Sequence, residues 1–115
     1  MKARLPEGYG GGTQNMNAMI RQAQKMQEEM TEKQEELAAR EFQGSAGGGM
    51  VEVTMNGKRE IVSLTIKPDV VDADDIEMLQ DLITAAVNET YRHVEEVTNE
   101  EMEKITGGLN VPGMF

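Results

Sequence analysis

A chain of 115 residues with a formal net charge of −10 and no cysteine can form at most one domain of ordinary size. The lack of cysteine excludes disulfide frameworks, thiolate zinc sites and cysteine nucleophiles. The sequence shows no secretory signal and no apolar run long enough to span a bilayer, so we expect a cytoplasmic protein that does not contact membranes.

The negative charge is concentrated in the last third of the chain. Residues 69–115 contain twelve acidic residues and only Arg92 and Lys104 as basic ones, whereas residues 1–68 contain nine of each. A strongly acidic protein is repelled by nucleic acid at long range. Any contact with phosphate must therefore come from local basic clusters in residues 1–68.

The chain is predicted to begin with a flexible arm followed by a long helix. Residues 1–13 form the arm, because Pro6 and four glycines disfavour regular structure, and Lys2 and Arg4 give it a positive tip. The helix is expected over residues 15–40. Its apolar residues fall on the a and d positions of a heptad: Met16, Met19, Ala23, Met26, Met30 and Leu37. This stripe predicts a face that packs on the core, and part of it can also be a seam between subunits.

Three short strands are expected after this helix, over residues 41–45, 50–55 and 60–67. The glycine-rich segment 44–49 predicts a loop, and Asn56-Gly57 is typical of a hairpin turn. Apolar residues occupy alternate positions in the second and third strands: Val51, Val53, Met55, Val62, Leu64 and Ile66.

The length of the hairpin turn decides which residues lie opposite each other. A two-residue turn would place Val53 opposite Glu60. A four-residue turn pairs Val53 with Val62 and Val51 with Leu64, so that apolar side chains meet on one face. We therefore favour the four-residue turn.

A second long helix is predicted from Asp74 to Ile105. A cluster of aspartates precedes it, as suits a helix N-terminus, and Gly107-Gly108 is expected to end it. The apolar tail that follows, residues 109–115, is too short to form a helix.

The predicted order is α-β-β-β-α, which is an α+β fold with long terminal helices around a small antiparallel sheet. Each helix would be roughly 40 Å long or more, whereas a compact monomer of this length is about 35 Å across. A three-stranded sheet also has two open edges and marginal stability. We therefore expect an elongated chain that forms a homodimer through residues 14–106, with residues 107–115 as a separate tail.

Catalytic chemistry finds little support in the sequence. His93 has Glu89 and Glu96 on its helical face, which is a conceivable metal site, but a solvated acidic face is the favoured interpretation. The loop Gly44–Gly49 lacks the Lys-Ser/Thr pair of a phosphate-binding loop, and it is interpreted as a turn. We predict no enzymatic activity, no cofactor, no bound metal and no small-molecule substrate.

The basic residues of the first two thirds of the chain are the candidates for binding. Two neighbours share one helix face, two lie at the hairpin tip and two lie on the arm: Arg21, Lys25, Lys58, Arg59, Lys2 and Arg4. Any one of them can be ordinary surface charge. Without aromatic residues beside them, they favour contact with the backbone of duplex DNA over stacking on single strands.

Four segments, in this order along the chain, resemble the YbaB/EbfC family of bacterial nucleoid-associated proteins. They are MIRQAQKMQ (19–27), GGMVEVTMNG (48–57), DDIEMLQDL (74–82) and GGLNVPGMF (107–115). The resemblance implies a small cytoplasmic homodimer shaped like tweezers, located in the nucleoid. It also implies binding to duplex DNA with little sequence preference, with roles in DNA conformation, nucleoid organisation and gene regulation.

The same resemblance assigns DNA contacts to projecting helices, where the matching basic residues are Arg21 and Lys25. The assignment of Lys58 and Arg59 rests on charge and exposure alone. The main alternative is an acidic adaptor that binds basic DNA-maintenance proteins through the second helix and the tail, with incidental DNA contact.

Overall fold

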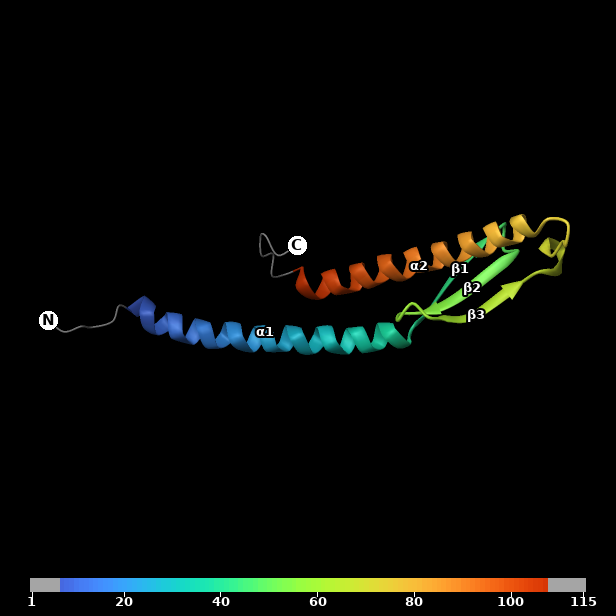
Figure 1. Ribbon diagram of the computed structural model, residues 1–115. Helices are drawn as coiled ribbons and strands as arrows, with labels where there is room; N and C mark the ends of the chain where they lie inside the picture. Colours follow the sequence, from blue (N-terminus) through green and yellow to red (C-terminus); the bar gives the residue numbers. More distant parts are fainter. Residues whose placement is uncertain (1–6, 108–115) are drawn as a thin grey trace.

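The computed structural model describes residues 7–107, with side chains from residue 15 onward. A long helix precedes and a long helix follows a small sheet, as the sequence predicted for an α+β fold, and the sheet lies at one end of the molecule (Figure 1). In chain order the elements are α1 (Glu7–Ala39), β1 (Glu41–Ala46), β2 (Val51–Asn56), β3 (Ile61–Ile66), the 3-10 turn η1 (Pro68–Val70) and α2 (Ile76–Thr106).

Helix α1 begins earlier than predicted. It starts at Glu7 rather than Asn15, so residues 7–13 are helical and the prediction of an irregular arm is wrong for them. Extending a helix that has already formed adds one hydrogen bond per residue, and a glycine costs only about 1 kcal/mol relative to alanine. The glycines therefore weaken this end of the helix without ending it. Lys2 and Arg4 lie outside the described residues.

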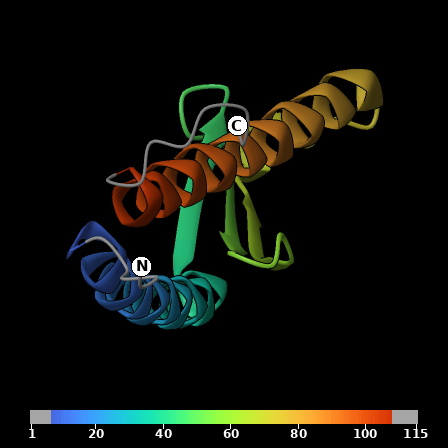
Figure 2. The same ribbon diagram turned by 90° about the vertical axis from the view of Figure 1, so that its left-hand side faces the viewer.

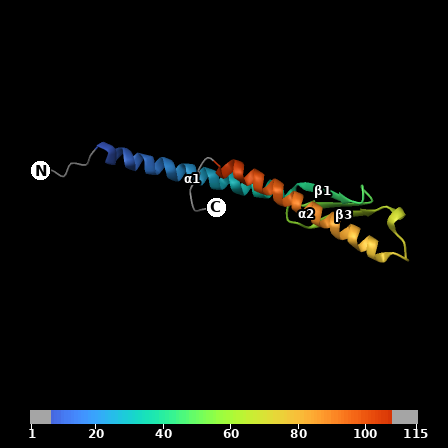
Figure 3. The ribbon, with the colours of Figure 1, turned by 90° about the horizontal axis from the view of Figure 1, so that it is seen from above.

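The molecule is strongly elongated, as the helix lengths predicted. Its principal extents are 93 × 24 × 16 Å, and its radius of gyration is 24.0 Å against about 13 Å for a compact domain of this size. Helices α1 and α2 run in opposite directions, and the N-terminal half of α1 projects beyond the end of α2 (Figures 1 and 3).

Helix α2 packs across β1 and β2 of the antiparallel sheet, whose strand order is β1-β2-β3. The closest approach is at Gly44, where a Cβ would lie 2.8 Å from the backbone nitrogen of Thr90 and closer still to its hydroxyl. The buried Thr90 hydroxyl donates a hydrogen bond to the Ala86 carbonyl at 2.7 Å. A side chain at position 44 would therefore push α2 away from the sheet.

The C-terminal end of α1 is attached to the same core. Leu37 is buried with Phe42, Met55 and Val94, so one cluster joins α1, β1, β2 and α2. The hairpin between β2 and β3 also touches this end, because a Cβ on Gly57 would overlap the carbonyl oxygen of Leu37. Figure 2 shows α2 crossing the strands, while α1 lies below them at the end where β1 begins.

The predicted pairing of β2 with β3 is wrong by two residues. Val53 lies opposite Leu64 and Val51 opposite Ile66, whereas the four-residue turn had predicted Val62 and Leu64. A register shift between Thr54 and Met55 accommodates one extra residue of β3. A shift of two residues keeps every side chain on its face, so apolar residues still meet apolar residues.

The turn itself explains this outcome. The backbone N–H groups of Lys58 and Glu60 both donate to Asn56 Oδ1, at 2.9 and 3.1 Å, and Arg59 adopts a left-handed backbone with φ of 65°. Asn56 N–H also donates to the Glu60 carbonyl at 3.0 Å. These local bonds fix the turn, and the bulge then restores the apolar pairing further along.

Strand β3 is the least covered element of the sheet. Ile61, Val62 and Leu64 are 50%, 51% and 44% exposed, whereas Val51 and Val53 of the neighbouring β2 are almost fully buried. No strand of residues 7–107 pairs with the outer edge of β3. The sheet therefore presents an apolar surface at an open edge.

Candidate nucleic-acid interface

Nine basic side chains lie in the described part of the chain, and ion pairing divides them into two groups. Five have a carboxylate within 4.0 Å: Lys33, Arg40, Arg59, Arg92 and Lys104. Among the side chains of residues 15–107, the remaining four form no such pair: Arg21, Lys25, Lys58 and Lys67. A cation without a protein carboxylate is the better candidate for a phosphate, because no ion pair must be broken first.

Arg21 and Lys25 lie on the projecting half of α1. Both are exposed, and their spacing of four residues places them one turn apart on one face of the helix. Successive residues are separated by about 100° around a helix, so Arg21 lies about 140° to 180° from the apolar face formed by Met19, Ala23, Met26 and Met30. Glu28 and Glu29 follow within one turn of Lys25 and weaken the positive potential there.

The hairpin tip holds Lys58 and Arg59, but their surroundings differ. Lys58 is exposed. The guanidinium of Arg59 instead pairs with Glu95, whose carboxylate also accepts from Arg59 Nε at 3.1 Å, and it lies 5.3 Å from the centre of the Tyr91 ring. The bond to Glu95 raises the pKa of Arg59 further. Arg59 therefore attaches the hairpin to α2, and its role as a DNA ligand is weakened.

The unpaired basic residues are not gathered in one place. The hairpin that carries Lys58 packs beside Leu37. Lys25 lies twelve residues before Leu37, so about 18 Å of helix separates Lys25 from this hairpin. Lys67 directly follows β3 and lies toward the other end of the molecule (Figure 1). Sequence reasoning missed Lys67, and its place after an apolar strand gave no signal of exposure.

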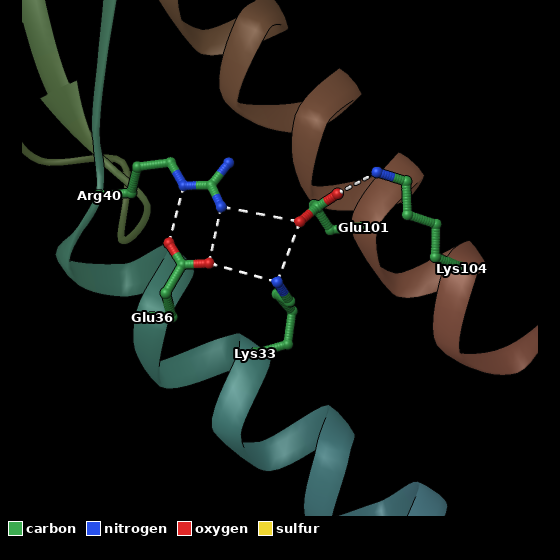
Figure 4. A network of polar contacts seen from close by, with 5 residues as sticks. All are labelled: Lys33, Glu36, Arg40, Glu101 and Lys104. Atoms are coloured by element: carbon green, nitrogen blue, oxygen red, sulfur yellow. Dashed lines mark hydrogen bonds and ion pairs between the residues drawn. The ribbon is translucent and has the colours of Figure 1, made fainter.

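A network of charges fixes the junction from which α1 projects (Figure 4). Glu101 of α2 accepts from Lys33 of α1 at 3.1 Å and from Lys104 at 2.7 Å, and Arg40 lies 3.7 Å away. Glu36 accepts two bonds from Arg40, at 2.6 and 2.7 Å. The contacts of Lys33 and Arg40 with Glu101 join the C-terminal end of α1 to α2.

The network also shifts the acid–base properties of its members. Hydrogen bonds from Lys104 and Lys33 lower the pKa of Glu101 to about 2. The bond from Arg40 lowers the pKa of Glu36, and the bond to Glu101 raises the pKa of Lys33. The carboxylates therefore stay charged and bonded at neutral pH, and they keep Lys33, Arg40 and Lys104 from serving as free cations.

His93 has a packing role in the structure. Its Nδ1 lies 3.1 Å from the Gln43 carbonyl oxygen, and its ring meets the edge of Phe42 at a centroid distance of 5.6 Å. Within residues 15–107, no three histidine, aspartate or glutamate side chains are grouped closely enough to hold a metal ion. The helices of the described part include none that is long and apolar enough to cross a bilayer.

The structure thus defines a small elongated α+β protein whose projecting helix presents two cations that have no carboxylate partner among the described side chains. The chain belongs to the YbaB/EbfC DNA-binding family, whose sequence profile matches residues 12–109, and the resemblance noted from the four segments is confirmed.

Several proteins of known sequence or structure are similar to this chain. A nucleoid-associated protein of Clostridium novyi (strain NT) is 58% identical over 108 residues, which cover 94% of each chain. A nucleoid-associated protein of Thermoanaerobacter pseudethanolicus is 56% identical over 108 residues, covering 94% of this chain and 96% of that one. The crystal structure of an uncharacterised protein from Helicobacter pylori matches with a TM-score of 0.56 and 31% identity, over 68% of this chain and 90% of that chain.

Proposed function

We propose that this protein is a nucleoid-associated homodimer that binds the backbone of duplex DNA with little sequence preference. Binding by two projecting helices alters the conformation of the DNA and contributes to nucleoid organisation and gene regulation. The observation that carries this proposal is the pair Arg21 and Lys25, two exposed cations on one face of the projecting helix without a carboxylate partner among the described side chains.

The low sequence preference follows from the chemistry of these contacts. Contacts from cations to phosphate oxygens position a protein on DNA but carry no sequence information. Among the side chains of residues 15–107, aromatic groups that could stack on bases are scarce, because Phe42 is buried in the core and Tyr91 lies against Arg59. The net charge of −10 opposes binding at long range, so we expect modest affinity that falls steeply with salt.

The open edge at β3 supports the proposed homodimer. The exposed Ile61, Val62 and Leu64 lie beside the region that α2 covers, and they form an apolar surface that a second copy can bury. A symmetric pair would present two α1 helices, and each would bring one Arg21 and one Lys25 to the duplex. Light scattering should then give twice the chain mass of 12.7 kDa.

The combined substitution Arg21→Gln and Lys25→Gln tests the phosphate contacts. We expect binding to mixed-sequence duplexes at low salt to weaken by about tenfold or more, and by a similar factor for every sequence, because phosphate contacts are lost rather than base contacts. Fluorescence anisotropy on several unrelated duplexes measures this directly.

The matched control is Arg92→Glu, which changes the net charge by the same two units at an exposed cation that already has a carboxylate partner. This control should bind within about twofold of the unmodified protein, since paired surface cations contribute little. Equal weakening in both variants would show a general charge effect. Unchanged affinity in the first variant would favour the adaptor function, in which DNA contact is incidental.

A further inference from the structure

The projecting half of α1 has an apolar face that the described part of the chain leaves largely open, with Met26 and Met30 only half-buried. This face, which we call the methionine face, consists of Met19, Ala23, Met26 and Met30 and lines a groove together with Gln22 and Gln27. Met19 is 67% exposed. The face lies about 140° to 180° around the helix from Arg21, so it is separate from the basic pair of the proposed DNA contact.

The end of α2 lies at the start of this face. Glu101 of α2 pairs with Lys33 of α1. One turn closer to the end of α2, Ile105 lines a hollow together with Lys33 and Glu29, which lies one turn before Lys33 on α1. Because the two helices run in opposite directions, the last turn of α2 points along α1 toward the N-terminal half of α1 (Figure 1).

The eight residues that follow Gly107 have the length and the chemistry to cover the face. Their sequence is GLNVPGMF, with four large apolar side chains and no charge. Eight extended residues span up to about 26 Å, whereas the methionine face from Met30 to Met19 is about 16 Å long. The proline favours an extended backbone for such a segment.

We propose that residues 108–115 dock on the methionine face of α1 in the same chain. The docked tail removes the methionines from water and stiffens the helix that projects beyond α2. A helical segment that projects alone is marginally stable in water, so a small apolar contact along it shifts its stability. Docking leaves Arg21 and Lys25 free on the opposite face, and the inference holds whether or not the protein binds DNA.

Disulfide trapping tests the docking directly, because the chain has no cysteine of its own. The pair Met26→Cys and Val111→Cys should form a disulfide within one chain under mild oxidation. The matched control is Glu28→Cys with Val111→Cys, because Glu28 is exposed and lies on the opposite side of the helix. We expect at least fivefold more intrachain product from the first pair, read as a faster band on a non-reducing denaturing gel and by mass.

Equal yields from the two pairs would overturn the docking. Product that forms only between chains would overturn docking within one chain. Rapid disulfide-linked dimers of Met26→Cys alone would assign the methionine face to a second copy instead of the tail.

A second measurement does not depend on cysteine chemistry. A chain that stops at Gly107 should show amide hydrogen exchange about tenfold faster in residues 16–30, while exchange in residues 41–66 stays unchanged and confirms that the sheet is folded. Unchanged exchange in residues 16–30 would contradict the proposal.

Discussion

Two adjacent basic residues at one hairpin tip have different surroundings in this protein. The sequence placed Lys58 and Arg59 together as exposed candidates, and only the structure separates them. Arg59 is held by Glu95 and lies over Tyr91, residues more than thirty positions later in the chain. Local sequence reasoning predicts exposure from a turn, but it has no access to a partner brought close by the packing of another element. Lys67 and the bulge of β3 escaped prediction for other reasons: a lysine after an apolar strand carries no signal of exposure, and the bulge follows from the bonds that Asn56 accepts within the turn.

At the residue scale, Leu64 tests the proposed interface between two copies. Leu64→Glu places a charge on the 44% exposed apolar surface of β3, and we expect the dimer to dissociate at micromolar concentration because a desolvated charge is costly. Sedimentation or light scattering measures the mass.

The control for Leu64→Glu is Thr65→Glu, an exposed neighbour that lies opposite Glu52 on the other face of the sheet. It should leave the mass at twice that of one chain. A dimer that survives Leu64→Glu, or a monomer in both the unmodified protein and the control, would contradict the interface.

At the element scale, the heptad stripe of α1 predicted more of the fold than any other pattern, but it did not predict how much of the apolar face is buried. It predicted the helix and its apolar face, and Leu37 is indeed in the core. The stripe continues unchanged through Met16 and Met19, which are 62% and 67% exposed because α2 ends before reaching them. Periodicity reports which face of a helix is apolar, whereas the lengths of the neighbouring elements decide how much of that face is buried.

The junction between α1 and α2 predicts a dependence of stability on pH. The folded-state pKa of Glu101 is lowered to about 2 from an ordinary value of 4.5, chiefly by hydrogen bonds from Lys104 and Lys33. A depressed carboxylate pKa stabilises the fold above the unfolded-state value, and this contribution is lost as the pH falls through the folded-state value. We therefore expect the urea midpoint to decrease between about pH 4.5 and pH 2.

The variant Glu101→Gln isolates this contribution. It should be less stable than the unmodified protein at pH 7, and the difference between the two urea midpoints should shrink as the pH falls toward 2. Glu100→Gln, at the exposed neighbouring position, is the matched control and should follow the unmodified protein. A constant difference between Glu101→Gln and the unmodified protein across this range would show that the carboxylate does not act through its charge.

At the scale of the whole molecule, the shape was predictable because helix length is a property of the sequence. Two helices of 33 and 31 residues cannot fit inside a compact domain of 115 residues, and the extent of 93 Å follows. The elongated form places Arg21 and Lys25 on α1 before Glu29 and Lys33, which meet the end of α2, so the pair lies beyond the acidic helix and not alongside it. This separation gives an acidic protein a local surface that can approach phosphate.

The central claim, that two copies bind phosphates through Arg21 and Lys25, is tested most directly by the dependence of DNA affinity on salt. Each phosphate contact contributes about 0.9 to the slope of log affinity against log salt concentration. Removing both residues from a dimer removes four contacts, so Arg21→Gln with Lys25→Gln should reduce the magnitude of the slope by about 3 to 4, against about 2 for a monomer. An unchanged slope in this variant would contradict the account.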